Sequence, residues 1–244
     1  MFFFFLTSGL FLGWSLGAND AANIFGTAVG SKMIRFRTAA IIAGIFVIIG
    51  ATLQGSGTTN TLSHLGAVDA VAGAFTVALS AAVVIFLMTK ALIPVSTTQA
   101  IVGAIIGWNL FTGHKTDMKL LTTIVTTWVV SPVIGAVFAA FFYILLRALL
   151  KRLQIHLVIL DVCIKWALII VGAFGAYSLG ANNIANVMGV FAGSAPDIVI
   201  DLGIFSLDGL QVLFLLGGIA IATGILTYSR NLMIKVGNGI MALS

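Results

Sequence analysis

The sequence predicts an all-α integral membrane protein, and three observations support that prediction. The chain of 244 residues is 60% hydrophobic and only 8% charged, whereas soluble proteins carry about 25% charged residues. Its mean hydropathy of +1.18 is too high for a water-facing surface. Its apolar runs have the length of about 20 residues that a spanning helix needs, and none shows the alternation typical of a membrane β-barrel.

Seven hydrophobic segments follow one another, and we expect each to be helical. They are 2–30, 38–54, 65–89, 92–112, 119–146, 157–192 and 209–228. The first and the sixth are expected to be broken near polar motifs, at 17–20 and at 180–183. The segment 92–112 has polar residues in its first two turns, so it either spans the membrane or forms one arm of a re-entrant hairpin.

Basic residues set the expected orientation, because cytoplasmic loops are enriched in Lys and Arg. They follow the first, fifth and seventh segments, whereas 55–64 and 193–208 carry none. The positive-inside rule therefore places the N-terminus outside, and Lys115 and Lys119 fall on the wrong side of the membrane in this orientation. The short loops favour the inner cell membrane as the location of this multi-pass protein. The net charge of +5 is explained by these loops and does not indicate a nucleic-acid partner. The inside residues are Lys32, Arg35, Arg37, Arg147, Lys151, Arg152, Arg230 and Lys235.

One motif occurs twice. Residues 15–31, SLGANDAANIFGTAVGS, align without a gap onto 178–194, SLGANNIANVMGVFAGS, with 10 of 17 positions identical. The orientation above makes the two copies antiparallel. Related units of opposite orientation are typical of a secondary transporter with a pseudo-two-fold axis in the membrane plane. We expect a first repeat over 1–152, and the beginning of a second, inverted repeat over 153–244.

Asp20 lies within the first segment, where inserting a carboxylate costs at least about 2.5 kcal/mol. It must pair with a charge, bind a cation or take up a proton, and the nearest basic residue in the sequence is Lys32. We expect Gly17 to break the helix and to free carbonyl groups beside Asn19 and Asn23, which gives oxygen ligands for a hard cation. The alternative is that Asp20 ends a helix at the membrane interface, where solvent supplies its partners.

The stretch PVSTTQ at 94–99 predicts an anion site. Proline favours the first turn of a helix, so the residues after it should present free N–H groups and the positive end of the helix dipole. Further donors come from the side chains of Ser96, Thr97, Thr98 and Gln99. A tetrahedral oxyanion held in this way needs no Lys or Arg, and it would lower the penalty of burying a cation nearby. The alternative is a Ser/Thr-rich kink that packs against another helix.

The sequence contains no nucleotide-binding loop, catalytic triad or cysteine–histidine cluster. We therefore expect no enzymatic activity and no resident cofactor, and the only ions expected are those that are transported.

Three motifs together resemble the inorganic phosphate transporter family, whose members are symporters that move phosphate with sodium or protons. They are GANDAAN at 17–23, PVSTTQAIVGAIIG at 94–107 and GANNIAN at 180–186. The resemblance extends over essentially the whole chain. It implies a homodimeric helical transporter of inverted repeats in the lipid bilayer, working by alternating access, with its phosphate site near the midplane.

The resemblance also implies roles for individual residues. The residues implied to contact phosphate are Ser96, Thr97, Thr98, Gln99 and Asn183. Those implied for the cation and coupling region are Asn19, Asp20, Asn23, Asn182 and Asn186. Sodium itself would be bound by Asp20 and Asn23.

The chain departs from the family pattern in three places. Asn183 stands where the second motif usually carries an acid, which leaves one carboxylate in place of two. Gln99 stands where many members carry His, which favours sodium over protons as the coupling ion. A second PVSTTQ motif would begin near 257 by the offset of 163 between the two copies, so the second repeat is expected to be incomplete and its remaining C-terminal part to be a partner in the site.

Three other functions remain open from the sequence: proton-coupled transport of phosphate, transport of another tetrahedral oxyanion such as sulfate, and a passive anion channel or a non-transporting receptor on the same scaffold.

Overall fold

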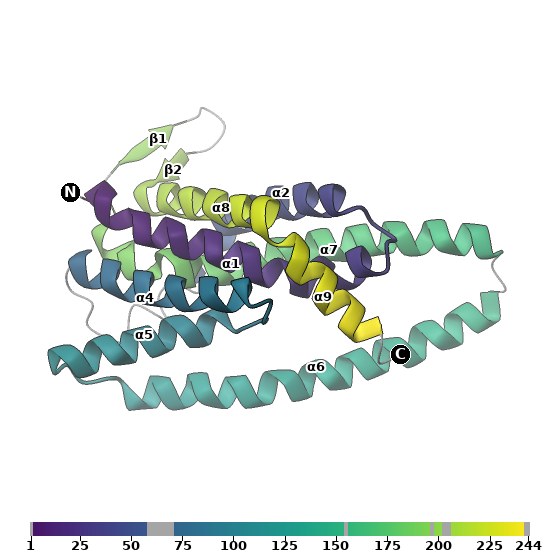
Figure 1. Ribbon diagram of the computed structural model, residues 1–244, viewed down its shortest axis with the longest axis horizontal. Coiled ribbons are helices and arrows are strands. Elements are labelled where there is room, and N and C mark those ends of the chain that lie inside the picture. Colours follow the sequence, from purple (N-terminus) through teal and green to yellow (C-terminus); the bar gives the residue numbers. More distant parts are fainter. Residues whose placement is uncertain (1, 58–70, 154–155, 196–197, 202–205, 242–244) are drawn as a thin grey trace.

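The computed structural model describes residues 2–57, 71–153, 156–195, 198–201 and 206–241, which form an almost entirely helical bundle (Figure 1). The predicted start of the third segment, 65–70, lies outside the described residues. The helices are α1 (Phe2–Gly30), α2 (Phe36–Gln54), α4 (Val71–Lys90), α5 (Thr97–Thr112), α6 (Met118–Leu153), α7 (Leu157–Met188), α8 (Gly209–Tyr228) and α9 (Arg230–Met241). A short 3-10 helix, η1 (Gly189–Ser194), and two paired antiparallel strands, β1 (Val199–Asp201) and β2 (Ser206–Asp208), connect α7 to α8.

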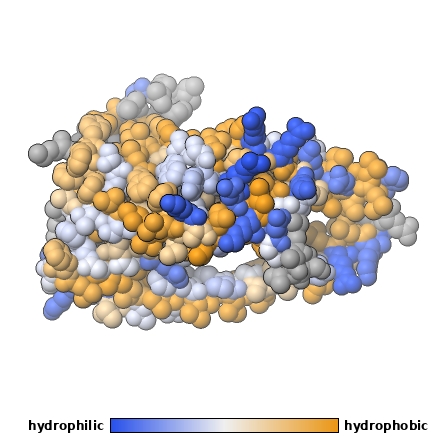
Figure 2. Space-filling view, in the orientation of Figure 1, coloured by the Kyte–Doolittle hydropathy of each residue, from blue (hydrophilic) through white to orange (hydrophobic). Residues whose placement is uncertain are grey.

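The helical content confirms the predicted all-α membrane class. Five described helical stretches are long and apolar enough to cross a membrane, namely Phe36–Gln54, Val71–Lys90, Met118–Arg152, Leu157–Ser194 and Gly209–Tyr228. The outer helix α6 exposes large apolar side chains such as Val133, Phe138 and Ile144. Hydrophobic residues likewise cover much of the surface in Figure 2. A surface of this kind suits contact with lipid chains.

Helices α1 and α8 cross backbone against backbone. A Cβ atom added to Gly17 would lie 2.0 Å from the carbonyl oxygen of Ile221, and one added to Gly224 would lie 2.0 Å from that of Trp14. No side chain fits in so short a distance. Glycine at both positions therefore allows the two helices to approach more closely than any other residue would permit.

Helices α2 and α7 cross in the same way. A Cβ atom on Gly50 would lie 2.0 Å from the carbonyl oxygen of Tyr177, and one on Gly180 would lie 2.1 Å from that of Val47. The repeated motif thus places one glycine at each crossing, Gly17 in its first copy and Gly180 in its second.

These crossings correct the prediction that the first and sixth segments are broken at 17–20 and at 180–183. Both α1 and α7 run through their polar motifs as continuous helices. The physical reason is that Gly17 and Gly180 serve helix packing, for which the missing side chain matters and the backbone stays helical. The predicted release of backbone carbonyl groups beside Asp20 is therefore wrong.

The contacts among the four central helices are related by two sequence offsets. Adding 163 converts Gly17 of α1 into Gly180 of α7, and adding 174 converts Gly50 of α2 into Gly224 of α8. The α1–α8 and α2–α7 crossings are thus made by corresponding residues. Helices α1 and α7 run in opposite directions along the long axis of the bundle (Figure 1).

The α2–α8 contact is reciprocal under the same offset of 174. A Cβ atom on Gly44 would contact Ala222, and one on Gly218 would contact Ile48. Under this offset Gly44 corresponds to Gly218 and Ile48 corresponds to Ala222, so each contact is the counterpart of the other. The predicted inverted repeat would produce such a reciprocal contact.

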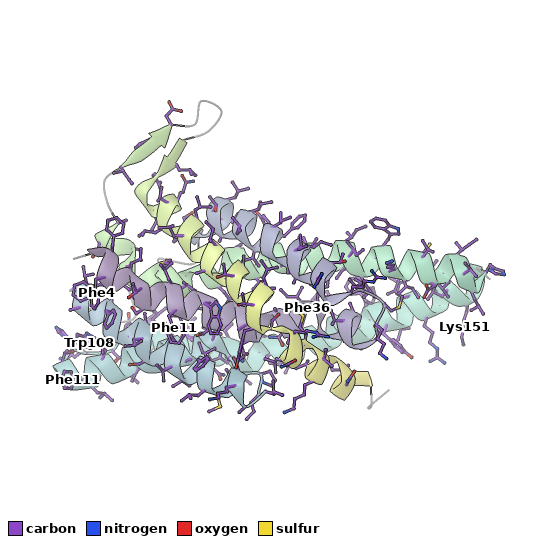
Figure 3. All side chains as sticks on the ribbon, turned by 45° about the horizontal axis from the view of Figure 1, so that its top comes forward. Phe4, Phe11, Phe36, Trp108, Phe111 and Lys151 are labelled. Atoms are coloured by element: carbon purple, nitrogen blue, oxygen red, sulfur yellow. The ribbon has the colours of Figure 1, made fainter. Side chains whose placement is uncertain are left out.

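Helices α4 and α5 form a hairpin beside α1. The ring of Phe4 stacks on that of Phe75 at 5.7 Å, and those of Phe11 and Phe86 lie 5.9 Å apart, so α4 runs parallel to α1. Helix α5 returns along α4, and its end near Trp108 lies at the same end of the molecule as Phe4 (Figure 3). Helix α5 has 16 residues and is not among the stretches long enough to cross a membrane, and the re-entrant arrangement of 92–112 stays a prediction.

Most of the predicted inside loops lie at one end of the bundle. The α1–α2 turn and the last turn of α6, which carries Lys151, lie opposite the N-terminus and the two strands (Figures 1 and 3). The α5–α6 connection, with Lys115 and Lys119 beside it, lies at the N-terminal end, where the sequence prediction also placed it.

Candidate functional site

Asn19 fastens the tip of the α4–α5 hairpin to α1. Its side chain is fully buried. The Nδ2 atom donates to Thr89 Oγ1 at 2.8 Å and to the Ile93 carbonyl oxygen at 3.2 Å, while Oδ1 accepts from the Val95 N–H at 3.0 Å. One amide thus bonds both sides of the turn between the two helices. Asn19 supports the site from behind, and it is not among the residues that line the pocket described below.

Asp20 is buried next to the start of α5. Its Oδ2 atom accepts a hydrogen bond from Thr97 Oγ1 at 3.0 Å. Among the described residues, no basic side chain lies within ion-pair distance of this carboxylate. Asp20 lies in the middle of a continuous helix, so the alternative that it ends a helix at the interface is wrong.

The first turn of α5 presents donors toward the same place. Ser96 is the N-cap residue, and its hydroxyl oxygen accepts the N–H of Gln99 at 3.3 Å. The N–H groups of Thr97 and Thr98 precede the first intrahelical hydrogen bonds, so they are available at the positive end of the helix dipole. The predicted helix start after Pro94 is confirmed, with α5 beginning at Thr97.

A pocket of about 390 Å³ brings the acid and the helix start together. Helix α1 contributes a carboxylate and an amide, the hairpin tip contributes backbone and hydroxyl groups, and α7 contributes a second amide. The lining residues are Asp20, Asn23, Pro94, Val95, Ser96, Thr97, Thr98 and Asn183. Asp20 is the only ionisable side chain among them.

Asn186 connects α7 to this arrangement. Its Nδ2 atom donates to Thr98 Oγ1 at 3.0 Å and to Asn183 Oδ1 at 2.7 Å. The second copy of the motif thus contacts the start of α5 through Thr98, as the first copy does through Thr97. Asn186 holds Asn183 and Thr98 in place, and Asn183 itself faces the pocket.

A second cavity of about 450 Å³ adjoins the first, and Ser96 and Thr98 line both. Asn182 and Asn186 line its α7 side, and Thr123 and Thr127 line its α6 side. These two threonines were missed by sequence reasoning. The signal for them was a pair of hydroxyls four residues apart on an apolar helix, which places both on one face.

Six of the predicted residues therefore meet in one pocket: Asp20, Asn23, Ser96, Thr97, Thr98 and Asn183. Four others do not line it. Asn19 lies behind the hairpin tip, Asn182 and Asn186 line the second cavity, and the exposed Gln99 lines neither cavity. Thr89, which accepts from Asn19, is a supporting residue that the sequence did not single out.

The pocket offers two kinds of chemistry side by side. A carboxylate with amide and hydroxyl oxygens suits a hard cation. A helix start with free N–H groups and hydroxyl donors suits an oxyanion. Apolar helices of spanning length around a polar pocket are typical of an integral membrane transporter.

The comparisons with known proteins identify the family. The profile of the phosphate transporter family matches residues 16–162, more than half of the chain. The chain therefore belongs to the phosphate transporter family, in agreement with the resemblance seen in its motifs.

Individual relatives agree with this assignment. A sodium-dependent phosphate transporter of Plasmodium falciparum is 36% identical over 138 residues, which are 49% of this chain and 20% of that protein. A predicted phosphate permease of Methanocaldococcus jannaschii is 38% identical over 124 residues, which are 50% of this chain and 40% of that protein. The chain thus matches well under half of the length of these curated relatives.

A solved structure shares the fold. The structure described as "The sodium-dependent phosphate transporter" matches 97% of this chain and 77% of its own, with a TM-score of 0.74 and 24% sequence identity. The overall fold of this chain is thus one found in that solved structure.

Proposed function

We propose that this protein moves inorganic phosphate across the cell membrane together with sodium, through the pocket between α1, α5 and α7. One observation supports the proposal above the others: the Asp20 carboxylate and the N-terminus of α5 share one pocket and are bridged by the Thr97 hydroxyl. Membership of the phosphate transporter family and the names of its relatives supply the substrate and the ion.

Phosphate fits the hairpin side of the pocket. Its oxygens would accept from the N–H groups of Thr97 and Thr98 and from the Ser96 hydroxyl, all at the positive end of α5. No Lys or Arg lines the pocket, so these donors alone do not neutralise a phosphate anion. A co-transported cation would supply the missing positive charge, and this is the physical reason to expect coupling.

Sodium fits the α1 side of the pocket. Asp20 and Asn23 offer carboxylate and amide oxygens there, which are ligands that hard cations prefer. Occupation by sodium would offset the burial of the Asp20 carboxylate in the absence of a basic partner. Gln99 has no titratable group, so it does not provide the proton site that a histidine at that position would.

The opposite directions of α1 and α7 and their matched glycine crossings support an inverted repeat. On this proposal the boundary lies between 152 and 153, and the two repeats interleave, because α1 packs on α8 and α2 packs on α7. Alternating access would then arise from two units that share a pseudo-two-fold axis, with the pocket beside it.

Uptake of radiolabelled phosphate into proteoliposomes tests the proposal. Sodium and proton gradients are imposed separately, with sulfate and arsenate as competitors. We expect accumulation driven by inward sodium, inhibited by arsenate and not by sulfate. Accumulation driven by a proton gradient alone would show that the coupling ion is the proton and not sodium. Equilibration of phosphate without accumulation would indicate a channel.

A variant of the acid locates the coupling. Asp20→Asn keeps the shape of the side chain and removes its charge, so we expect sodium-driven accumulation to be lost. Asp161→Asn, the same change at an exposed acid of α7 that lines neither cavity, serves as the control. Normal sodium-dependent uptake by Asp20→Asn would contradict the assignment of Asp20 to coupling.

A further inference from the structure

A separate cavity of about 370 Å³ lies where the end of α1, the start of α2 and one face of α9 meet. Three basic side chains line it, Lys32, Arg35 and Arg230. They come from two connections nearly 200 residues apart in the sequence. None of the residues that line it lines the transport pocket.

The turn between α1 and α2 fixes two of these basic residues. Lys32 has a φ angle of 63°, in the left-handed region that residues with a side chain rarely adopt. Its N–H donates to the Val29 carbonyl oxygen at 3.1 Å, and the N–H of Ile34 donates to that of Ala28 at 3.0 Å. These bonds close the turn, so that Arg35 follows at once as the N-cap residue of α2.

One face of helix α9 forms another wall of the cavity. Arg230, Ile234 and Asn238 lie four residues apart and therefore share one face, and all three line the cavity. The helix is fixed tightly to α1, because a Cβ atom on Gly237 would lie 2.0 Å from the carbonyl oxygen of Gly26. The wall that carries Arg230 is thus held in place by backbone packing.

The cavity is positively charged and unneutralised. No acidic residue lines it, and within the described ranges no carboxylate forms an ion pair with Lys32, Arg35 or Arg230. The start of α2 adds to the positive potential, because its N-cap residue provides no side-chain hydrogen bond to the first N–H groups. Figure 2 shows hydrophilic residues gathered around this part of the surface.

The chemistry of the lining identifies the ligand class. Two arginines and a lysine around a small cavity suit a phosphate group. Val29, Ile34 and Phe36 line the same cavity and would contact an apolar attachment to that group. Basic pockets between helices at the cytoplasmic side of a membrane are known to hold lipid headgroups, and the positive-inside rule assigns this end to the cytoplasm.

We infer that this cavity binds the phosphate headgroup of an anionic membrane lipid. The inference does not depend on the proposed transport function, because the two sites share no lining residue. A free phosphate ion offers the same group without the apolar attachment, so the experiment compares the two sources.

The test measures binding of short-chain phospholipids to the purified protein in detergent by thermal shift and by native mass spectrometry. The probes are dioctanoyl phosphatidic acid, dioctanoyl phosphatidylcholine as the zwitterionic comparison, and inorganic phosphate. The variant combines Lys32→Gln, Arg35→Gln and Arg230→Gln. The matched control removes the same number of charges from α6 at the same end of the bundle, with Arg147→Gln, Lys151→Gln and Arg152→Gln.

We expect the affinity for dioctanoyl phosphatidic acid to fall at least about tenfold in the cavity variant and to stay nearly unchanged in the control. Arg35→Lys with Arg230→Lys keeps the charge and should retain most of the binding, which separates loss of the site from loss of folding. Asp20→Asn should leave lipid binding unaltered, whatever its effect on transport.

The phosphate arm identifies the source of the group. Displacement of the lipid by millimolar inorganic phosphate, lost in the cavity variant, would support a site for free phosphate. No displacement would support the lipid. Equal loss of lipid binding in the cavity variant and the control, or no loss in either, would overturn the inference.

Discussion

The glycine crossings and the tip of the α4–α5 hairpin hold the bundle together by opposite means. At the crossings, α1 meets α8 and α2 meets α7 through backbone atoms, with glycines where any side chain would collide. At the tip, polar side chains of α1 hold a turn by hydrogen bonds, chiefly those of Asn19. The conformation at a crossing can change only if the two helices separate. The conformation at the tip can change if the hydrogen bonds are exchanged for others. The pocket that contains Asp20 lies at the second kind of contact, because Pro94, Val95 and Ser96 of the tip line it.

The largest expected effect comes from a side chain placed in a crossing. Gly17→Val would put a Cβ atom 2.0 Å from a backbone oxygen that no rotamer can avoid. We expect destabilisation of about 3 kcal/mol or more, seen as a lower melting temperature and loss of monodisperse protein. Gly103→Ala in α5 is the control, because a Cβ atom there meets nothing within 4 Å. It should stabilise the protein by roughly 0.5–1 kcal/mol, and equal melting temperatures of the two variants would contradict the packing role of Gly17.

A smaller but still large effect is expected at the hairpin tip. Asn19→Leu keeps the volume of the side chain and removes all three hydrogen bonds, leaving the Val95 N–H without its partner. Each lost partner of a buried polar group costs about 1–3 kcal/mol. Hydrogen exchange over 89–99 should therefore accelerate at least about tenfold, while the α1–α8 crossing stays protected.

Asn23→Leu, one turn further along α1, is the matched control because Asn23 is exposed and lies outside the Asn19 network. Unchanged exchange at the tip in Asn19→Leu, or equal acceleration in both variants, would show that the tip is held by something other than Asn19.

The same comparison explains which features of the structure could be predicted from the sequence. Composition predicts the helical class and the number of apolar segments. Residue chemistry predicts that Asp20 and the PVSTTQ stretch belong to one site. The continuity of α1 through Gly17 did not follow, because a glycine beside polar residues is compatible with a break and equally with a close crossing. Only the position of Ile221, more than 200 residues away, decides between them.

The directions in which the polar side chains point could not be predicted from the sequence either. Asn19 and Asp20 are neighbours in one motif, yet Asn19 binds the hairpin from behind and Asp20 faces the pocket. Asn182 and Asn183 separate in the same manner, into two adjoining cavities. A helix turns about 100° per residue, so adjacent polar residues cannot all serve one site, and the partner helices determine which of them does.

Loss of the hydrogen bond between Thr97 of α5 and Asp20 should have a moderate effect on sodium-dependent uptake. Thr97→Val removes the hydroxyl that donates to Asp20 and retains the shape, and hydrogen bonds to charged groups contribute about 1.5–3 kcal/mol. We expect the sodium concentration needed for half-maximal uptake to change by roughly tenfold with little change in melting temperature. Thr97→Ser restores the hydroxyl and should restore the sodium response. Failure of serine to do so would indicate that the methyl group, not the hydroxyl, matters at this position.

The smallest expected effect is at Asn183, where the second copy of the motif lacks the acid of the first. Asn183→Asp keeps an oxygen that can accept from Asn186 and adds a charge to a pocket that already contains Asp20. Asn183 is only half-buried, so solvent screens the added charge, and we expect phosphate affinity to fall by no more than about tenfold while sodium dependence becomes steeper. Asn182→Asp places the same charge one residue earlier, facing the second cavity, and should leave both parameters nearly unchanged. Equal effects of the two variants would mean that the added charge acts on both cavities. The pocket around Asp20 would then not be electrostatically separate from the second cavity.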